Sequence, residues 1–375
     1  MTILLATILI LLAGSHAWAR DQVVTVGLFQ LFQPQLLQIT PENSGRVFLE
    51  APTGKSQRLL LRREILEVRI GEKGQLRVRI LGEGSDFAAT SVEMIPAQWK
   101  ISIPGKIERL FSGGLTVSAR NGGILPVLSL GAEAATLQIL RSEMSAVREP
   151  EALKAQAILV RSYLGKPRHL DEGFDFCDTT HCQFLTGYSA EVDNFQHAVK
   201  RTRHLVLTYR GQAIAPLYTA VCGGRTLPRV NHHAEGLADY PYLSLACPFC
   251  AGHPLAHWKS QMKRSDLLDV LSLISTGLSA QDLLEQLANS EVDRPESTRL
   301  RDQVRLQVGR RHGWNVIRSN RYVVDASSDP IEITGWGSGH NSGLCQAGAV
   351  ELARQGKSFL QILRFYFPGC SVQLE

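Results

Sequence analysis

One stretch of the chain, residues 141–163, places a carboxylate just ahead of a predicted helix. Pro150 suits a first helical turn, and the apolar residues that follow it recur at three- and four-residue spacing. Burial beside such a helix would raise the pKa of Glu143, because apolar surroundings disfavour a charged carboxylate. Glu143 is therefore a candidate proton donor near neutral pH. The alternative is a glutamate that only caps a surface turn.

Two further carboxylates, Glu149 and Glu151, compete with Glu143 for this role. Both lie at the start of the predicted helix, where negative charge complements the positive helix end. Their positions therefore have a complete structural explanation, and Glu143 is the preferred acid.

A group of cysteine and histidine residues could bind a metal ion. Cys177, His181 and Cys182 lie close together in the sequence, and His169 is eight residues upstream of Cys177. Two thiolates and an imidazole suit tetrahedral zinc. A disulfide between Cys177 and Cys182 is the first alternative, because an exported protein meets an oxidising compartment, and free thiols are the second.

Cys247 and Cys250 form a second pair with CxxC spacing. No thioredoxin-like pattern precedes them, so a local structural disulfide is the first interpretation. A zinc site completed by His253 or His257 is the alternative.

Three cysteines then remain: Cys222, Cys345 and Cys370. A disulfide between Cys222 and Cys345 would join two glycine-rich segments. A free Cys345 beside His340 could instead be a thiol nucleophile with its base. The sequence offers no third group to orient that pair, so this hypothesis ranks last.

Four ordered blocks of the sequence resemble the SpoIID family, the stage II sporulation protein D and amidase-enhancer domain. The first contains Ser-Glu-Met, then Glu-Ala-Leu-Lys-Ala-Gln-Ala and Arg-Ser-Tyr. The others contain Cys-Asp-Thr-Thr-His-Cys-Gln, Cys-Gly-Gly-Arg-Thr and Gly-Trp-Gly-Ser-Gly-His-Asn-Ser-Gly-Leu-Cys-Gln-Ala-Gly-Ala. Together they cover about residues 113–370, a far more specific match than one short motif. Ser145 stands where the family usually has proline, and Asn341 where it has glycine.

The resemblance implies a lytic transglycosylase that cleaves the MurNAc to GlcNAc β-1,4 bond of peptidoglycan glycan strands, with Glu143 as its acid and base. The C6 hydroxyl of the sugar replaces water and gives a 1,6-anhydro product. No second carboxylate is then needed, unlike in most glycosidases. The alternative is a non-catalytic wall-binding protein that enhances an N-acetylmuramoyl-L-alanine amidase.

The resemblance also implies a structural zinc, since family members with the Cys/His block can carry one. The transferred ligands are His169, Cys177 and Cys182, with His181 as an alternative third ligand.

The glycine-rich blocks predict the walls of a groove for glycan, because glycine permits positive φ and close approach of a ligand to the backbone. Some side chains could donate hydrogen bonds to sugars, and a tryptophan could stack on them. Each could instead be structural. The candidate substrate-binding residues are Tyr218, Gly223, Gly224, Thr226, Trp336, His340 and Gln346.

Residues 1–19 predict a signal peptide, because an apolar run ends in Ala17-Trp18-Ala19. An uncleaved anchor is the alternative, and no later segment is long and apolar enough to span a bilayer. We expect export to the periplasm or the extracellular space, in association with the cell wall. The net charge of +5 is mild, and no nucleic-acid motif is present.

The order of patterns predicts an α+β fold. Short alternating strands indicate a β-rich N-terminal domain at residues 20–110, followed by a SpoIID-like domain at residues 111–375. Within the latter we expect a helical insertion at residues 265–289, strands at 301–333, and closing helices at 346–355 and 359–366.

Overall fold

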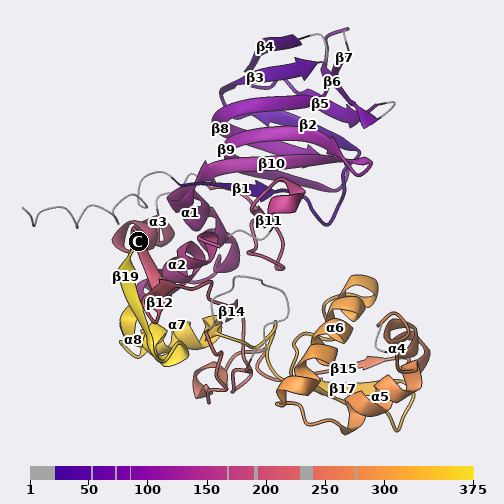
Figure 1. The fold of residues 1–375 in the computed structure, drawn as a ribbon, viewed down its shortest axis with the longest axis vertical. Coiled ribbons are helices and arrows are strands. Elements are labelled where there is room, and N and C mark those ends of the chain that lie inside the picture. The colour runs from indigo at the N-terminus through magenta and orange to yellow at the C-terminus, as the bar shows by residue number, and fades with distance from the viewer. Residues whose placement is uncertain are drawn as a thin grey trace, which may run out of the picture.

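The computed structural model describes residues 22–51, 54–71, 74–84, 86–166, 169–189, 193–228, 240–274 and 277–375. The predicted signal peptide lies outside these residues. None of the helices in the described ranges is long and apolar enough to cross a membrane. The chain has a large β-rich N-terminal region followed by parts that contain both helices and strands, so the predicted α+β class is confirmed (Figure 1).

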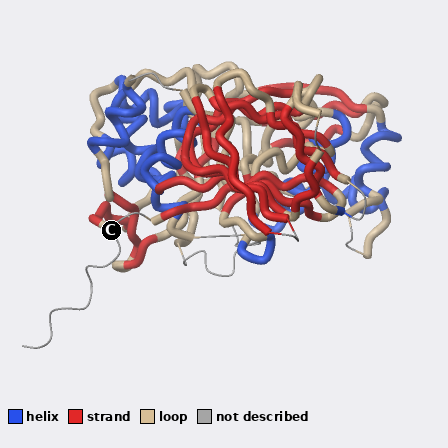
Figure 2. The backbone as a smooth tube through the Cα atoms, turned by 90° about the horizontal axis from the view of Figure 1, so that it is seen from above, coloured by secondary structure: helices blue, strands red, loops and turns tan. Residues whose placement is uncertain are grey.

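The N-terminal part is a large, mostly antiparallel sheet. Its strands run in the order β11-β1-β10-β9-β8-β2-β5-β6-β7, and the β3–β4 hairpin joins through β8. Viewed from above, the strands bend and do not form one flat layer (Figure 2). The strands are β1 (Val23–Gly27), β2 (Leu36–Pro41), β3 (Ser44–Ala51), β4 (Gly54–Leu61), β5 (Leu66–Ile70), β6 (Leu76–Ile80), β7 (Phe87–Ala89), β8 (Ser91–Ile103), β9 (Ile107–Arg120), β10 (Gly123–Gly131) and β11 (Phe176–Cys177).

Alternating side chains build this sheet, as the sequence predicted for residues 23–104. In β6, for example, Leu76, Val78 and Ile80 are buried and the arginines between them are not. The buried side chains form one core around Trp99 and Phe111. The predicted domain boundary after residue 110 falls within β9 and stays a prediction.

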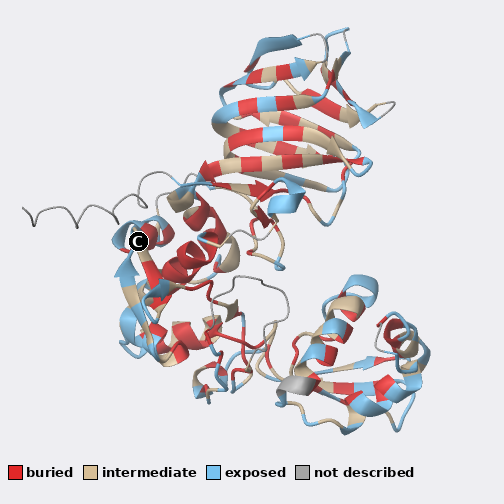
Figure 3. Cartoon of the chain, viewed as in Figure 1, coloured by how far each residue is buried: buried red, intermediate tan, exposed pale blue. Residues whose placement is uncertain are grey.

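A helical part follows, centred on α2 (Pro150–Leu164). This helix packs against the surrounding helices, and from Ala152 onward all but Lys154 of its residues are buried (Figure 3). Alanines on the faces between its large apolar residues allow such close packing on every side. Its surroundings are α1 (Ala132–Glu143), α3 (Asn194–Arg201), α7 (Gln346–Arg354), α8 (Phe359–Tyr366) and the strands β12 (Leu205–Tyr209), β13 (Gln212–Ala213), β14 (Tyr218–Thr219), β18 (Leu344–Cys345) and β19 (Cys370–Leu374). Both predicted closing helices, α7 and α8, are confirmed.

The remaining part has a separate apolar core and a three-stranded sheet in the order β15-β17-β16. The predicted helices at residues 265–289 are confirmed as α4 and α5, with Gly277 at φ +77° between them. The elements are β15 (Trp258–Met262), α4 (Arg264–Leu271), α5 (Ala280–Asn289), α6 (Pro295–His312), β16 (Tyr322–Asp325) and β17 (Ile331–Gly335).

The strand prediction for residues 301–333 is wrong in its first half, which belongs to α6. Leu300, Val304 and Val308 are buried at four-residue spacing and form one face of this helix. Because Leu306 lies between Val304 and Val308, every second residue here is apolar, which is the pattern of a strand. The strands begin only at Tyr322.

Candidate active site and metal-binding clusters

Glu143 is the last residue of α1 and is partly exposed. Its Oε1 atom accepts a hydrogen bond of 2.7 Å from the main-chain N–H of Phe184 and one of 3.2 Å from the hydroxyl of Tyr218. The amide of Gln346, the first residue of α7, also lies by this carboxyl group. Its nitrogen makes no hydrogen bond of normal geometry to any described residue. Four separate parts of the sequence thus meet at one carboxyl group.

The electrostatic surroundings keep Glu143 protonated to an unusually high pH. Burial raises its pKa to about 7, although the hydrogen bonds from Phe184 and Tyr218 and the nearby amide of Gln346 act in the opposite direction. The C-terminal end of α1 also disfavours a negative charge there. At neutral pH, roughly half of the molecules therefore carry a proton on Glu143. A carboxylic acid with a pKa near neutrality can both donate and accept a proton.

The hydroxyl group of Tyr218 keeps its proton and acts as a hydrogen-bond donor. Burial, followed by the negative charge of Glu143, raises its pKa well above the usual value, so the phenol stays protonated. Its hydroxyl lies 3.2 Å from Glu143 and 3.0 Å from Oε1 of Gln183, and the single proton is shared between them. Tyr218 is positioned by β14, which pairs in parallel with β18 and places Tyr218 opposite Leu344.

The segment after Cys182 runs along the end of α1. Phe184 bonds to Glu143, and the main-chain N–H of Thr186 donates to Oγ of Ser142 at 2.9 Å. Gln183 donates from Nε2 to the carbonyl of Val160 in α2. We did not predict Gln183 or Phe184 as site residues. The sequence feature that could have indicated them is their position directly after Cys182, the last residue of the Cys/His pattern.

Glu149 and Glu151 have structural partners. Burial opposes their ionisation, but hydrogen bonds from Arg354 and Lys154 outweigh it and lower the pKa of each carboxyl group. Arg354 pairs with Glu149 at 2.7 Å, and the N–H of Phe359 donates to Glu151 at 2.8 Å. Both carboxylates therefore tie α2 to the two closing helices.

The structure brings His169, Cys177, His181 and Cys182 into one cluster. Their ligand atoms all lie within 4.8 Å of one another. Nε2 of His169 is 3.2 Å from Sγ of Cys182, and Nδ1 of His181 is 3.8 Å from Sγ of Cys177. Both histidines are included, although the sequence left open which of them would be the third ligand.

This donor set fits zinc. Bonds of about 2.3 Å to sulfur and 2.0–2.1 Å to nitrogen place the ligand atoms of a regular tetrahedron about 3.6 Å apart, close to the distances found. Nδ1 of His169 lies 2.8 Å from Oε1 of Glu172, in the short helix η2 (Leu170–Glu172). A carboxylate behind a histidine is the usual orienting partner of a zinc ligand. The hydrogen bond with Cys182 is the main cause that lowers the pKa of Cys177.

Asp178 fixes the Cys/His loop to the large sheet. Its carboxylate accepts from the main-chain N–H of Phe29 at 2.8 Å and pairs with Arg109 at 3.2 Å. The same loop continues through Cys182 into Gln183 and Phe184. The Cys/His cluster is therefore coupled through the backbone to the environment of Glu143.

Asn341 adopts the conformation that the family's glycine would have. Its φ is +60°, a region in which asparagine is tolerated better than most residues. The side chain is fully buried, and its Nδ2 donates to the carbonyls of Cys222 and Trp336 at 3.1 Å each. Its Oδ1 accepts from the N–H of Asn320 at 3.0 Å. The substitution thus preserves the turn and adds hydrogen bonds across it.

Gly223 and Gly224 form a turn next to Cys222, both with positive φ. A Cβ on Gly223 would lie 2.5 Å from the backbone of Trp336 and Gly337, so only glycine fits. Gly224 donates from its N–H to Sγ of Cys250 at 3.4 Å. These glycines therefore pack the turn against neighbouring segments.

Solvent exposure differs among three of the predicted sugar-binding residues: Trp336, His340 and Thr226. The Trp336 ring is partly exposed, with the Arg321 guanidinium 5.3 Å from its centre. His340 is also partly exposed, and its Nδ1 accepts from the N–H of Ser342 at 3.1 Å. Thr226 is 1% exposed, and its hydroxyl donates to the carbonyl of Leu243 and accepts from Leu245. We therefore assign Thr226 a structural role in place of sugar binding.

The disulfides expected from the sequence are not formed: none joins any two of the seven cysteines, all of which lie in the described residues. Cys222, Cys247, Cys250 and Cys345 instead lie in one buried cluster, with their sulfurs within 4.8 Å of one another. The sequence suggested two separate pairs, Cys247 with Cys250 and Cys222 with Cys345, but the fold brings all four cysteines together. A buried Cys345 also cannot reach substrate as a nucleophile.

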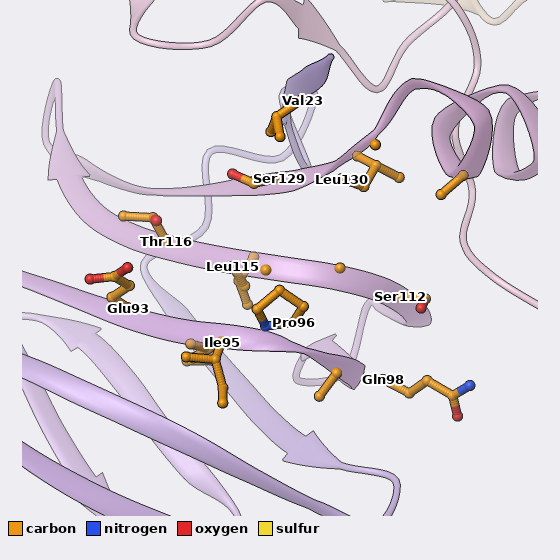
Figure 4. A pocket seen from close by; sticks show the side chains of 16 residues that line it. Val23, Glu93, Ile95, Pro96, Gln98, Ser112, Leu115, Thr116, Ser129 and Leu130 are labelled. Atoms are coloured by element: carbon orange, nitrogen blue, oxygen red, sulfur yellow. The ribbon is translucent and has the colours of Figure 1, made fainter. Parts of the chain in front are cut away.

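A hollow of about 570 Å³ lies elsewhere, on the large sheet (Figure 4). It adjoins the β-bulge between Met94 and Ala97 in β8, and Glu93 is the one carboxylate among the residues that line it. Ala134 reaches it from the first turn of α1, about 13 Å along the helix from Glu143. We assign no catalytic role to this hollow.

Comparison with known proteins agrees with the motifs. The model of the SpoIID family, described as stage II sporulation protein, matches residues 120–209, which include Glu143 and the Cys/His cluster. An uncharacterized protein of Brachyspira hyodysenteriae is 31% identical over 275 residues, covering 70% of this chain and 72% of that protein. The chain belongs to the SpoIID family. The predicted resemblance is thereby confirmed.

Two relatives in Bacillus subtilis have informative names. Stage II sporulation protein D is 24% identical over 258 residues, covering 62% of this SpoIID chain and 72% of that protein. The protein named amidase enhancer is 25% identical over 288 residues, covering 62% of this chain and 39% of the enhancer.

Proposed function

We propose that this SpoIID protein is an exported lytic transglycosylase that cleaves the MurNAc to GlcNAc β-1,4 bond of peptidoglycan glycan strands. The observation that carries the proposal is the state of Glu143. Its pKa is raised to about 7 by burial, and two separate segments donate hydrogen bonds to its carboxyl group. A related amidase enhancer supports a role at the cell wall.

In the first step, protonated Glu143 donates its proton to the bridging oxygen as the bond from C1 of MurNAc to that oxygen breaks. GlcNAc leaves with a free hydroxyl group. The Phe184 N–H and the Tyr218 hydroxyl then stabilise the carboxylate that forms, because both donate to Oε1. Tyr218 remains protonated throughout, since its own pKa is raised.

In the second step, the Glu143 carboxylate accepts the proton of the C6 hydroxyl as O6 bonds to C1 of the same sugar. A 1,6-anhydro ring closes and Glu143 regains its proton. No water is consumed, so one carboxyl group serves as acid and then as base. A pKa near 7 suits both roles at neutral pH.

The partly exposed residues near the glycine-rich turns are the proposed contacts for glycan. Trp336 offers an aromatic face, and His340 and Gln346 offer polar groups. Gly223 and Gly224 shape the turn beside them.

We further propose that His169, Cys177, His181 and Cys182 hold a structural zinc. The ion would fix the loop that ends in Phe184, the donor to Glu143. Four protein ligands close the coordination shell, which is typical of structural and not of catalytic zinc.

A second candidate function is a non-catalytic, wall-binding enhancer of an N-acetylmuramoyl-L-alanine amidase. The relative named amidase enhancer favours it. The two functions differ in whether this chain alone changes the glycan.

The test is to incubate the purified mature chain with denuded glycan strands and analyse the products by mass spectrometry. We expect fragments with 1,6-anhydro ends, which weigh one water less than hydrolysed fragments. Fragments with reducing ends would show hydrolysis instead. No cleavage, together with faster release of stem peptides by an added amidase, would support the enhancer.

A further inference from the structure

Four cysteines from three distant segments meet in the interior of the helical part. Cys222 follows β14, and Cys345 ends β18. Cys247 precedes the short helix η3 (Pro248–Cys250), and Cys250 is its last residue. All four are at most 1% exposed, and their sulfurs lie within 4.8 Å of one another. We refer to them as the four-cysteine cluster.

We propose that the four-cysteine cluster binds a second zinc ion with four thiolate ligands. The sulfurs of a regular tetrahedron with bonds of about 2.3 Å lie about 3.8 Å apart. Sγ of Cys222 lies 3.6 Å from Sγ of Cys250, close to that edge length. A disulfide requires about 2.05 Å. This site is separate from the proposed transglycosylase chemistry and does not depend on it.

The backbone around the cluster supplies donors to the sulfurs. The N–H groups of Cys222 and Gly348 each lie 3.3 Å from Sγ of Cys345, and that of Gly224 lies 3.4 Å from Sγ of Cys250. Such hydrogen bonds offset the charge of thiolates that remains after the metal binds. Cys345 is also the N-cap of α7, whose positive end favours a thiolate.

The phenol of Tyr366 completes the shell. Its hydroxyl lies 3.2 Å from Sγ of Cys247. A Cβ on Gly348 would lie 2.1 Å from that hydroxyl and 2.9 Å from the same sulfur, so glycine is required for this approach. The glycine at position 348 thus lets the Tyr366 hydroxyl approach the sulfur of Cys247.

The chemistry of the donors selects a soft ion. Thiolates favour zinc or iron over magnesium and calcium, and zinc adds stability without redox activity. His253, which the sequence offered as a ligand, is exposed and accepts a hydrogen bond from Leu255 at 3.1 Å. Neither His253 nor His257 belongs to the cluster.

The position of the four-cysteine cluster indicates a structural role for the second ion beside Glu143. Cys345 directly precedes Gln346, which lies by the Glu143 carboxyl group. Cys222 follows β14, which carries Tyr218 and pairs with β18. A metal that joins Cys222 to Cys345 would hold these two strands in register beside Glu143. The Cys/His cluster would fix the opposite side, through Phe184.

The experiment is elemental analysis of the purified full chain and of three variants, with zinc counted per chain. We expect two zinc ions in the wild type and one in each of Cys222→Ser and Cys182→Ser. Cys370→Ser is the matched control and should keep both, because Cys370 belongs to neither cluster. A wild type with one ion that is lost in Cys222→Ser but kept in Cys182→Ser would also support the proposal.

Cobalt substitution keeps the test valid if Cys222→Ser fails to fold. Cys182→Ser retains the four-cysteine cluster, so its cobalt form should show the d–d bands of a tetrahedral ion and strong thiolate-to-cobalt charge transfer. The proposal is overturned if Cys182→Ser binds no metal and its four cluster cysteines resist alkylation until they are reduced. That result would assign them to disulfides. Iron with sulfide in place of zinc would likewise overturn it.

Discussion

The main-chain N–H of Phe184 donates a hydrogen bond of 2.7 Å to Oε1 of Glu143, across 41 residues of sequence. Phe184 lies two residues after Cys182, a member of the Cys/His cluster. The proposed acid and the proposed metal therefore share one segment of backbone. Loss of order in the cluster should change the donor to Glu143 as well as the stability of the fold.

The first prediction concerns the pH dependence of glycan cleavage. Glu143 must be protonated in the free enzyme, and its pKa is about 7. We expect kcat/KM to be constant at acid pH and to fall roughly tenfold per pH unit above pH 7. Initial rates on denuded glycan over the pH range would show this. Glu149→Gln should give the same profile, and a rate that rises through pH 7 would exclude Glu143 as the acid.

The same shift predicts a stability difference that needs no activity assay. The pKa of Glu143 is raised from 4.5 in the unfolded chain to about 7 in the native state. The native state therefore binds the proton of Glu143 more tightly than the unfolded chain does. This proton binding contributes fully to the free energy of unfolding below pH 4.5, and the contribution is lost as the pH rises to about 7. Relative to Glu143→Gln, the wild type should lose roughly 1–3 kcal/mol over this range. Urea unfolding at pH 4.5 and 8 measures it, and an unchanged difference would refute the raised pKa.

Removal of metal from the Cys/His cluster should lower stability. The unfolded chain lacks the assembled ligands, so the free energy of binding contributes to folding. We expect a chelator to lower the Tm by about 5 °C or more, and Cys182→Ser to have a similar effect. Cys370→Ser should behave as wild type. Absence of metal, with a peptide map that joins Cys177 to Cys182, would establish the disulfide instead.

Asn341 allows a test of the glycine-rich turn. Alanine at this position would remove three buried hydrogen bonds and would also have to adopt a φ of +60°. We expect Asn341→Ala to reduce the free energy of unfolding by about 2–4 kcal/mol. Asn341→Gly should cost about 1 kcal/mol less, because glycine adopts this φ without strain. Equal losses in urea unfolding would show that the turn is not the cause.

Local patterns were sufficient for much of the fold. Pro150 and the spacing of apolar residues predicted α2, and alternation predicted the strands of the large sheet. The same rule failed for α6, where Val304 and Val308 fit both a helix and a strand pattern. Residues of one helix face can also alternate, so periodicity alone does not decide over so short a window.

The site was harder to predict, because its geometry depends on contacts between distant segments. The sequence identified Glu143 but could not show that Phe184, Tyr218 and Gln346 surround it. It presented Thr226 as a donor for sugar, whereas Leu243 and Leu245 already bind its hydroxyl. The sequence suggested a Cys247–Cys250 pair and a Cys222–Cys345 pair, and only the fold places Cys222 near Cys250.

The substitution Glu143→Gln tests the central claim most directly. Glutamine keeps the size of the side chain but cannot protonate the bridging oxygen of the glycan. The account predicts that binding to denuded glycan and the thermal unfolding curve remain, while release of 1,6-anhydro products falls about 10²–10⁴-fold. Glu149→Gln, whose carboxylate pairs with Arg354, is the matched control and should retain activity. Release of anhydro products by Glu143→Gln within a few fold of the wild-type rate would contradict the account.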